Sequence, residues 1–460
     1  MREKTAEVIA QKKFENQGGN RLFTNKDLKK LIIPLIIEQI LAVSVGMVDT
    51  IMVSSAGAAA TSGVSLVDMI NTLFINIFAA VATGGAVVSS QYLGQGRRDR
   101  ACQSANQLIL ITALLSLLIM VLSILFRRGI LTLLYGKVEE DVMANALVYL
   151  ILSAFSYPFL AVYNSCAALF RSMGNAKISM HASIIMNVIN VIGDALFIFG
   201  FHWGAAGAAG ASLISRMTAC FLLFFRLRDQ KLELHVGKNW KINRGMVRQI
   251  LGIGIPNGIE NSIFQLGRVL VVGIIALFGT SQIAANAIAN NLDGMGVLPG
   301  QAMSLAMITV VGRCVGAGDF GQAVYYAKKM MKITYVVNGL CCLGVLVTMP
   351  LTLKLYHLPQ DAVHLGMTLV IIHNSCAMIC WPASFCLANV LRAANDVKFP
   401  MCVSILSMIL FRIGFSYVLA VGLGLGAVGV WFAMVVDWLV RSGFFIGRFK
   451  SGRWMTFYKR

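Results

Sequence analysis

The sequence predicts an all-α integral membrane protein with twelve transmembrane helices, arranged as two six-helix bundles in a parallel 6+6 repeat. Three observations predict this fold: an apolar composition, twelve long apolar runs, and a resemblance between the two halves. Of the 460 residues, 57% are hydrophobic and 13% are charged, and the mean hydropathy is +0.75. A soluble domain of this length needs more surface charge, so soluble enzymes and disordered proteins are excluded.

Each apolar run is long enough to cross a bilayer, which takes about 20 apolar residues per helix. The runs show no strict alternation, and only helices or closed barrels satisfy their backbone groups within lipid, so each run predicts a helix. A polar connector separates the first six runs from the last six. The predicted spans are 31–53, 63–90, 105–126, 143–170, 179–201 and 205–226, then 247–278, 283–312, 325–353, 364–391, 399–423 and 425–446.

The net charge of +19 predicts the orientation of these spans. If both termini are cytoplasmic, 32 of the 39 Lys and Arg fall in inside segments and four in outside loops, as expected for cytoplasmic loops. The excess is therefore a topology signal, and no nucleic-acid partner is expected. The predicted organisation is a cytoplasmic tail (1–30), an N-terminal lobe (31–226), a cytoplasmic linker (227–246), a C-terminal lobe (247–446) and a second cytoplasmic tail (447–460).

The two halves of the sequence repeat each other at a nearly constant offset. Because six spans separate equivalent positions, the two bundles have the same orientation, and transporters built in this way bind cargo between their halves. A duplication without functional meaning is the alternative. The matched pairs are Pro34 with Pro256, Glu38 with Glu260 and Gly96 with Gly318 at a shift of 222, and Arg171 with Arg392 at a shift of 221.

Charged side chains lie within the predicted spans. A charge at mid-bilayer costs on the order of 3 kcal/mol, so such residues usually face a cavity or a partner. The acids are Glu38, Asp49, Asp68, Asp194, Glu260, Asp293 and Asp437, and the bases are Arg216, Arg268 and Arg412.

Some of these charges have expected structural partners. Asp437 and Arg441 are four residues apart on one predicted helix, which predicts an ion pair. Arg268 follows Glu260 by about two turns and is expected to neutralise an acid on its own face. Arg412 is expected to neutralise an acid of another helix.

Asp49 and Asp194 have no Lys or Arg nearby in sequence. Asn190 lies four residues before Asp194 and shares its helix face, Asn187 lies a turn earlier, and Ser212 lies in the next span. Carboxylate, amide and hydroxyl oxygens are ligands for a hard cation, and carboxylates also hold protons. These residues predict a cation or proton site, with interhelical hydrogen bonding as the alternative.

The motif Pro34-x14-Asp49-Thr50-Ile51-Met52-Val53, the turn from Arg171 to Lys177 and the pair Asn190-x3-Asp194 resemble the multidrug and toxic compound extrusion (MATE) family over about residues 31–446. The resemblance implies an exporter of cationic or amphipathic drugs and toxins in the plasma (inner) membrane, coupled to H⁺ or Na⁺ and without a cofactor.

The resemblance also implies roles for individual residues. Residues Asp49, Asn190, Asp194 and Ser212 match the family's cation or proton site, where Na⁺ would bind at the two carboxylates. Additional coupling or substrate-binding roles are predicted for Asn164, which matches an amide of some members, for Asn187 from its spacing to Asn190, and for Glu260 and its repeat partner Glu38. Many members carry an acid about two turns beyond the helix 7 proline, whereas Glu260 lies one turn after Pro256. The tenth span has His373 where some members have an acid, and a structural role for this histidine is favoured.

The expected mechanism is alternating access by a monomer in contact with membrane lipid. Met47, Met186 and Met303 are candidates to line an apolar cargo cavity, although core packing is the simpler interpretation of each. Pro34 removes one backbone hydrogen bond and is a candidate hinge. The alternative function is a flippase for lipid-linked precursors, for which three arginines are few. No catalytic arrangement or pore loop supports a membrane enzyme or a channel.

Overall fold

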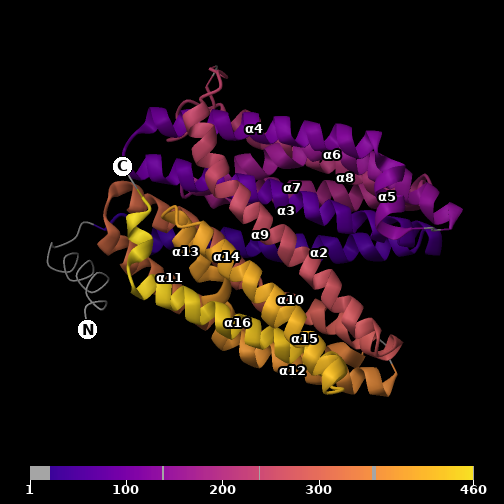
Figure 1. Ribbon diagram of the computed structural model, residues 1–460. Helices are drawn as coiled ribbons and strands as arrows, with labels where there is room; N and C mark the ends of the chain where they lie inside the picture. Colours follow the sequence, from indigo (N-terminus) through magenta and orange to yellow (C-terminus); the bar gives the residue numbers. More distant parts are fainter. Residues whose placement is uncertain (1–20, 137–138, 238, 355–358, 459–460) are drawn as a thin grey trace. The chain divides into compact units, whose positions relative to one another are not determined.

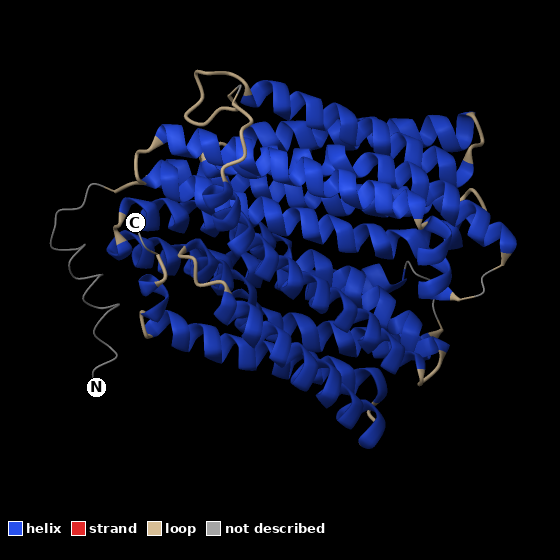
Figure 2. Ribbon diagram, turned by 45° about the horizontal axis from the view of Figure 1, so that its top comes forward, coloured by secondary structure: helices blue, strands red, loops and turns tan. Residues whose placement is uncertain are grey.

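The computed structural model describes residues 21–136, 139–237, 239–354 and 359–458. These residues form helices joined by short turns and one longer connector, with no strand among them (Figures 1 and 2). Twelve helical segments in this part of the chain are long and apolar enough to cross a membrane, which confirms the all-α fold and the predicted number of spans. Most of the helices extend several residues beyond the predicted apolar runs.

The first half contains six spans and one short helix. A compact unit, Lys29–Gly258, contains most of this half and is called the N-terminal unit below. Within it α6 packs against α3, α4 and α8, so the middle of α6 is enclosed by protein. The elements are α2 (Asn25–Ser54), α3 (Ala58–Gly94), α4 (Arg98–Leu125), α5 (Arg127–Tyr135), α6 (Glu140–Ser172), α7 (Ala176–Asp194), the π-helical turn η1 (Ala195–Gly200) and α8 (Gly204–Leu227).

The second half repeats this plan with more π-helical turns. Its compact unit comprises the described residues up to Leu28 and those from Ile259 onward, and is called the C-terminal unit. The elements are α9 (Arg244–Ala276), α10 (Thr280–Ala317), α11 (Phe320–Lys354), α12 (Gln360–Trp381), η2 (Pro382–Cys386), α13 (Leu387–Ala393), α14 (Lys398–Ser407), η3 (Met408–Gly414), α15 (Phe415–Tyr417), η4 (Val418–Gly422), α16 (Gly426–Lys450) and the 3₁₀ turn η5 (Arg453–Thr456).

The boundary between the two units falls inside a continuous helix. The first part of α9 belongs to the N-terminal unit, where Gly84 of α3 lies against the backbone of Ile250 and Gly254. The rest of α9, from Ile259, belongs to the C-terminal unit. Pro256 therefore lies two residues before the boundary. The connector before α9 is held within the N-terminal unit by side chains of α4, which bond to its backbone from Gln230 to Asn243.

The backbone confirms the internal repeat. Left-handed or otherwise positive φ angles recur at matching turns, where residues other than glycine are disfavoured. The shift is 221 at one of these turns and 222 at the others. The pairs are Gly57 with Gly279, Gly96 with Gly318, Gly174 with Asn395 and Gly204 with Gly426. The turn η3, between Asn395 and Gly426, has no counterpart in α7, and such π turns accommodate one extra residue in a helix.

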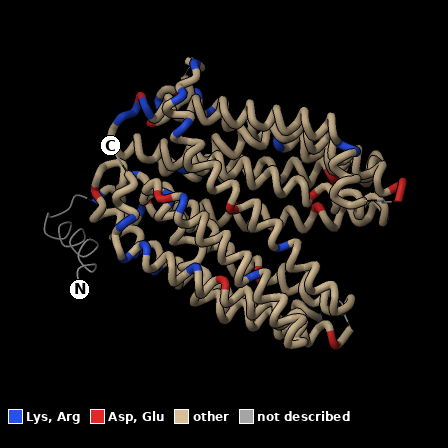
Figure 3. The backbone as a smooth tube through the Cα atoms, viewed as in Figure 1, with Lys and Arg blue, Asp and Glu red and all other residues tan. Residues whose placement is uncertain are grey.

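The outer surface of each unit is apolar, as a bilayer requires. Along α4, for example, Leu114, Leu118, Val121 and Leu125 are all exposed. In a bilayer these apolar side chains contact lipid hydrocarbon instead of water, so they do not need to be buried by other parts of the protein. Most Lys and Arg of each unit gather at one end of its helices (Figure 3).

Candidate cation or proton site

Asp49 and Asp194 line one cavity of about 160 Å³ inside the N-terminal unit. Asp49 comes from α2, and Asp194 is the last residue of α7 before the π turn η1. Their carboxyl groups are close enough to interact directly. The full lining is Gly46, Asp49, Thr50, Val53, Thr61, Val64, Ser65, Asp68, Tyr149, Asp194, Ala208, Ser212 and Arg216.

Asn190 links α7, which also carries Asp194, to α8, which carries Ser212. Its amide nitrogen donates to Asp194 Oδ2 at 3.3 Å and to Ser212 Oγ at 3.4 Å. The Oδ1 atoms of Asp49 and Asp194 are buried, and neither finds a hydrogen-bond partner among the described residues. The structure thus brings all four predicted residues together and leaves one oxygen of each carboxylate available to a ligand.

Asp68 is a third acid in the same cavity. The sequence identified it only as an acid within a predicted span. Its Oδ1 atom accepts from Tyr149 at 3.1 Å and from Asn71 at 3.2 Å. Tyr157 in turn donates to Asn71 Oδ1 at 2.8 Å. Because these donors occupy one oxygen of Asp68, this carboxylate is fixed more firmly than the other two.

Arg216 is the basic residue in the cavity lining, and the sequence analysis did not assign it to this site. It lies one turn after Ser212 on α8 and donates to Ser156 Oγ at 2.7 Å. The spacing of four residues from Ser212 is the signal that could have placed it on the same helix face. With Arg216 present, three carboxylates face one guanidinium.

Three other predicted residues lie away from the cavity lining. Asn164 is half-buried, and Asn187 is buried with no partner for its amide nitrogen in the described part of the chain. Glu38 ion-pairs with Arg171 at 3.4 Å and accepts from Ser179 at 3.1 Å. Glu38 and Asp49 are separated by three turns of α2, roughly 16 Å, so they belong to different sites.

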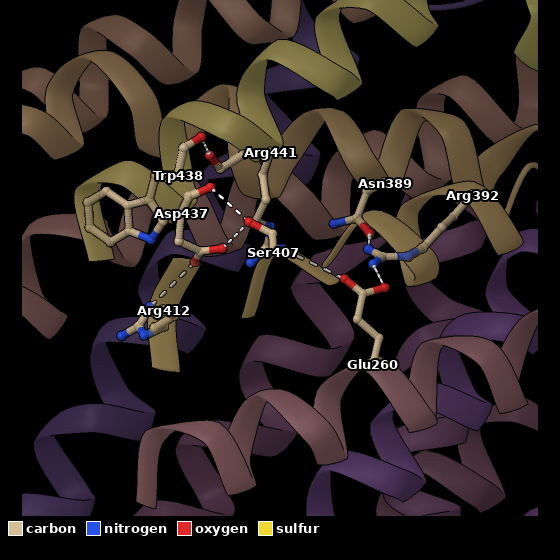
Figure 4. Close-up of polar contacts among 9 residues, drawn as sticks. Glu260, Asn389, Arg392, Ser407, Arg412, Asp437, Trp438 and Arg441 are labelled. Carbon is tan, nitrogen blue, oxygen red and sulfur yellow. Dashed lines mark hydrogen bonds and ion pairs between the residues drawn. The ribbon is translucent and has the colours of Figure 1, made fainter. Parts of the chain in front are cut away.

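Glu260 occupies the corresponding ion pair of the C-terminal unit (Figure 4). It lies 2.5 Å from Arg392 and 3.7 Å from Arg441. The prediction that Arg268 neutralises an acid on its own helix face is therefore wrong, because Glu260 pairs with two arginines from later helices.

Asp437 also differs from the prediction. Its ion-pair partner is Arg412 at 3.9 Å, and it accepts from Ser407 at 2.5 Å (Figure 4). The predicted pair between Asp437 and Arg441 is wrong, because Arg441 turns to Glu260 and lies over the ring of Phe385. The expectation that Arg412 neutralises an acid of another helix is confirmed.

His373 has the structural surroundings that its sequence suggested. Its Nδ1 atom is 3.3 Å from Asp293, and its ring packs edge-on against Trp431 and Trp438. Asn374 donates to the same Asp293 oxygen at 2.7 Å. Met303, one of the candidate cavity residues, is fully buried in the same unit. Within the described residues no group of three His, Cys, Asp or Glu side chains is placed to hold a metal ion.

Comparison with known proteins gives a consistent result. The family model described as MatE matches residues 34–196 and 256–418. The chain is 26% identical to the uncharacterized transporter YisQ of Bacillus subtilis (strain 168), over 92% of this chain and 93% of that protein. It is 24% identical to the probable multidrug resistance protein NorM of Thermotoga maritima, over 93% of each chain. A solved outward-facing multidrug resistance MATE transporter has the same fold, with a TM-score of 0.87, 18% identity and coverage of 94% of this chain and 96% of that one.

Proposed function

The chain belongs to the MATE family of multidrug efflux transporters, and on this premise we propose that it exports cationic or amphipathic small molecules by antiport with H⁺ or Na⁺. The observation that supports this proposal is the shared cavity of Asp49 and Asp194, with Asn190 and Ser212 beside them. The family match favours efflux over a lipid-linked precursor flippase.

The cavity has the chemistry that a coupling site needs. Two carboxylates at close range repel each other strongly where water is scarce. A proton or a Na⁺ between Asp49 and Asp194 removes this repulsion, and the Ser212 hydroxyl supplies a neutral oxygen for the cation. The Asn190 amide nitrogen holds Asp194 and Ser212 in place. The space of about 160 Å³ is enough for a small ion with water and too small for a drug.

Ion and cargo are coupled if they favour different conformations of the two lobes, 31–226 and 247–446. Ion binding then promotes cargo release, and cargo binding promotes ion release. Pro34 lies within α2, the helix that carries Asp49. A bend of α2 at Pro34 would therefore couple ion binding at Asp49 to a change in the shape of this helix. The basic ends of both units support cytoplasmic termini in this scheme.

Transport driven by an imposed gradient tests the proposal. Proteoliposomes are loaded with ethidium, and a pH gradient or a Na⁺ gradient is imposed separately. We expect one of the two gradients to accelerate ethidium movement in the opposite direction at least tenfold over protein-free vesicles. Failure of both gradients, with protein shown to be folded and inserted, would refute antiport.

A further inference from the structure

The C-terminal unit contains a second, smaller pocket of about 50 Å³. It lies between α9, α10, η3 and α16. The full lining is Arg268, Val271, Val272, Asn286, Asn290, Arg412, Val430, Trp431 and Met434.

This pocket is the repeat counterpart of the Asp49 and Asp194 cavity. Seven of its lining residues map, at a shift of 222, onto residues that line that cavity. The mapped pairs are Gly46 with Arg268, Asp49 with Val271, Thr50 with Val272, Val64 with Asn286, Asp68 with Asn290, Ala208 with Val430, and Ser212 with Met434.

Packing supports the register of this mapping. A Cβ atom on Gly207 of α8 would meet Phe197, and a Cβ atom on Gly429 of α16 would meet Leu419. Both glycines and both partners are related by the same shift of 222. The two pockets therefore occupy equivalent places in their own units.

The charge of the pocket is inverted. Asp49 is replaced by Val271 and Asp68 by Asn290, and the position of Asp194 becomes Phe415 or Ser416 under the two shifts. The lining instead contains Arg268 and Arg412, and it contains no carboxylate among the described residues. The pocket of the N-terminal unit is therefore acidic and its counterpart in the C-terminal unit is basic.

The two arginines are unequally neutralised. Arg412 is buried, lies 3.9 Å from Asp437 and stacks over the ring of Phe264. Its Nε atom has no hydrogen-bond acceptor among the described residues. Arg268 is exposed and forms no ion pair with any described residue. The nearby acid Glu260 is already held by two other arginines.

We propose that this pocket binds one oxyanionic group, a carboxylate or a phosphate, between Arg268 and Arg412. Guanidinium groups donate several hydrogen bonds in the geometry that oxyanions accept. The side-chain oxygen of Asn286 accepts from Trp431 at 3.0 Å and from Asn290 at 3.2 Å, so the donor end of its amide is available to a ligand. The volume fits one charged group and excludes a whole drug-sized molecule.

Two sources could supply this group: an amphipathic cargo with a carboxylate, or a membrane lipid with a phosphate. Anion binding at this pocket does not depend on the coupling ion, so it can be tested separately from antiport. Arg268 is the residue to change, because it is exposed and lacks an ion pair, whereas loss of Arg412 would strand the buried Asp437.

Binding of an aromatic acid and of its neutral amide tests the proposal. The full chain is placed in phosphatidylcholine nanodiscs, and equilibrium dialysis measures the affinities for 2-naphthoate and 2-naphthamide. We expect the wild type to prefer 2-naphthoate at least tenfold, R268Q to lose this preference and R268K to keep part of it. R226Q removes an exposed arginine elsewhere and should leave the preference unchanged.

A second arm replaces part of the lipid with phosphatidylglycerol and measures retained lipid by native mass spectrometry. Competition with 2-naphthoate and retention that depends on Arg268 would identify a lipid phosphate as the source. A preference for 2-naphthoate without such competition would identify a cargo carboxylate. The proposal is overturned if any preference for 2-naphthoate survives R268Q, or if the wild type shows neither that preference nor Arg268-dependent retention of phosphatidylglycerol.

Discussion

The equivalent pockets of the two units occupy matching places in the repeat and differ in charge. In the N-terminal unit three carboxylates and one guanidinium line a cavity of about 160 Å³, whereas two guanidinium groups and no carboxylate line about 50 Å³ in the described part of the C-terminal unit. Helix packing and the matching turns hold the backbone in register. Side chains that line a cavity are not held by close packing, so equivalent positions can carry opposite charges without disturbing the core.

The ion pairs at Glu38 and Glu260 show the opposite behaviour. Each glutamate lies one turn after a proline and pairs with an arginine at the equivalent position, Arg171 or Arg392. A pair kept in both halves, away from either pocket, is the pattern of a structural contact. The C-terminal version is shorter, at 2.5 Å against 3.4 Å, and has Arg441 as a second partner.

The largest expected effect comes from Asp194→Asn, which should abolish gradient-driven ethidium transport. The amide keeps the size of the side chain but cannot take up a proton or neutralise Na⁺. The protein should remain as stable as the wild type, since the change removes a buried charge. The measurement is uptake in proteoliposomes together with thermal unfolding, and Asp361→Asn, at the exposed start of α12, is the control. Full transport by Asp194→Asn would remove the functional contrast between the two pockets.

Arg392→Gln should lower the free energy of unfolding by about 3 kcal/mol, because it leaves Glu260 buried with only the longer contact to Arg441. Arg171→Gln, at the equivalent position, should cost about 1 kcal/mol, since its contact is longer and Ser179 still donates to Glu38. Denaturant unfolding in detergent measures both. Equal losses would show that the two pairs contribute alike despite their geometry.

Gly84→Ala should lower the free energy of unfolding by about 1–3 kcal/mol, because the added Cβ atom overlaps the carbonyl oxygen of Ile250 in α9. The equivalent residue in the C-terminal unit is already Ala306, which is fully buried. Gly252→Ala, which adds a Cβ atom into open space on α9, is the matched control and should not destabilise. Thermal unfolding compares the two variants. A neutral Gly84→Ala would mean that α3 and α9 can separate at no cost.

The smallest expected effect is that of Ser212→Ala. Loss of one hydroxyl beside Asn190 removes a neutral oxygen worth about 1 kcal/mol, which is about a fivefold rise in the ion concentration that half-saturates transport. The maximal rate should change little, since both carboxylates remain. Met434→Ala, at the equivalent position of the basic pocket, should leave the ion dependence unchanged. A fivefold shift in both variants would argue that the effect is not local to the acidic cavity.

The sequence was most informative where one physical requirement dominates. A bilayer requires long apolar helices, so the long apolar runs of the sequence predicted the twelve spans. The face shared by Asn190 and Asp194 follows from helical spacing and agrees with the structure. Neighbours in sequence misled at Asp437 and Arg441, because partners from other helices lie closer than the residue one turn away. The short helix α5 and the π-helical turns had no signal in the apolar pattern.

By itself, the sequence determined the membrane fold, the repeat and the four residues of the candidate coupling site. The fold follows from hydropathy, the repeat from a nearly constant offset, and the shared face of Asn190 and Asp194 from helix periodicity. The full set of four residues came from the family resemblance. Only the tertiary structure decided which charges pair, that Arg216 and Asp68 share the cavity of Asp49, and that the equivalent pocket of the other unit is basic. The reason is that an ion pair depends on distance in space, and residues brought together by helix packing can be more than a hundred positions apart in the chain.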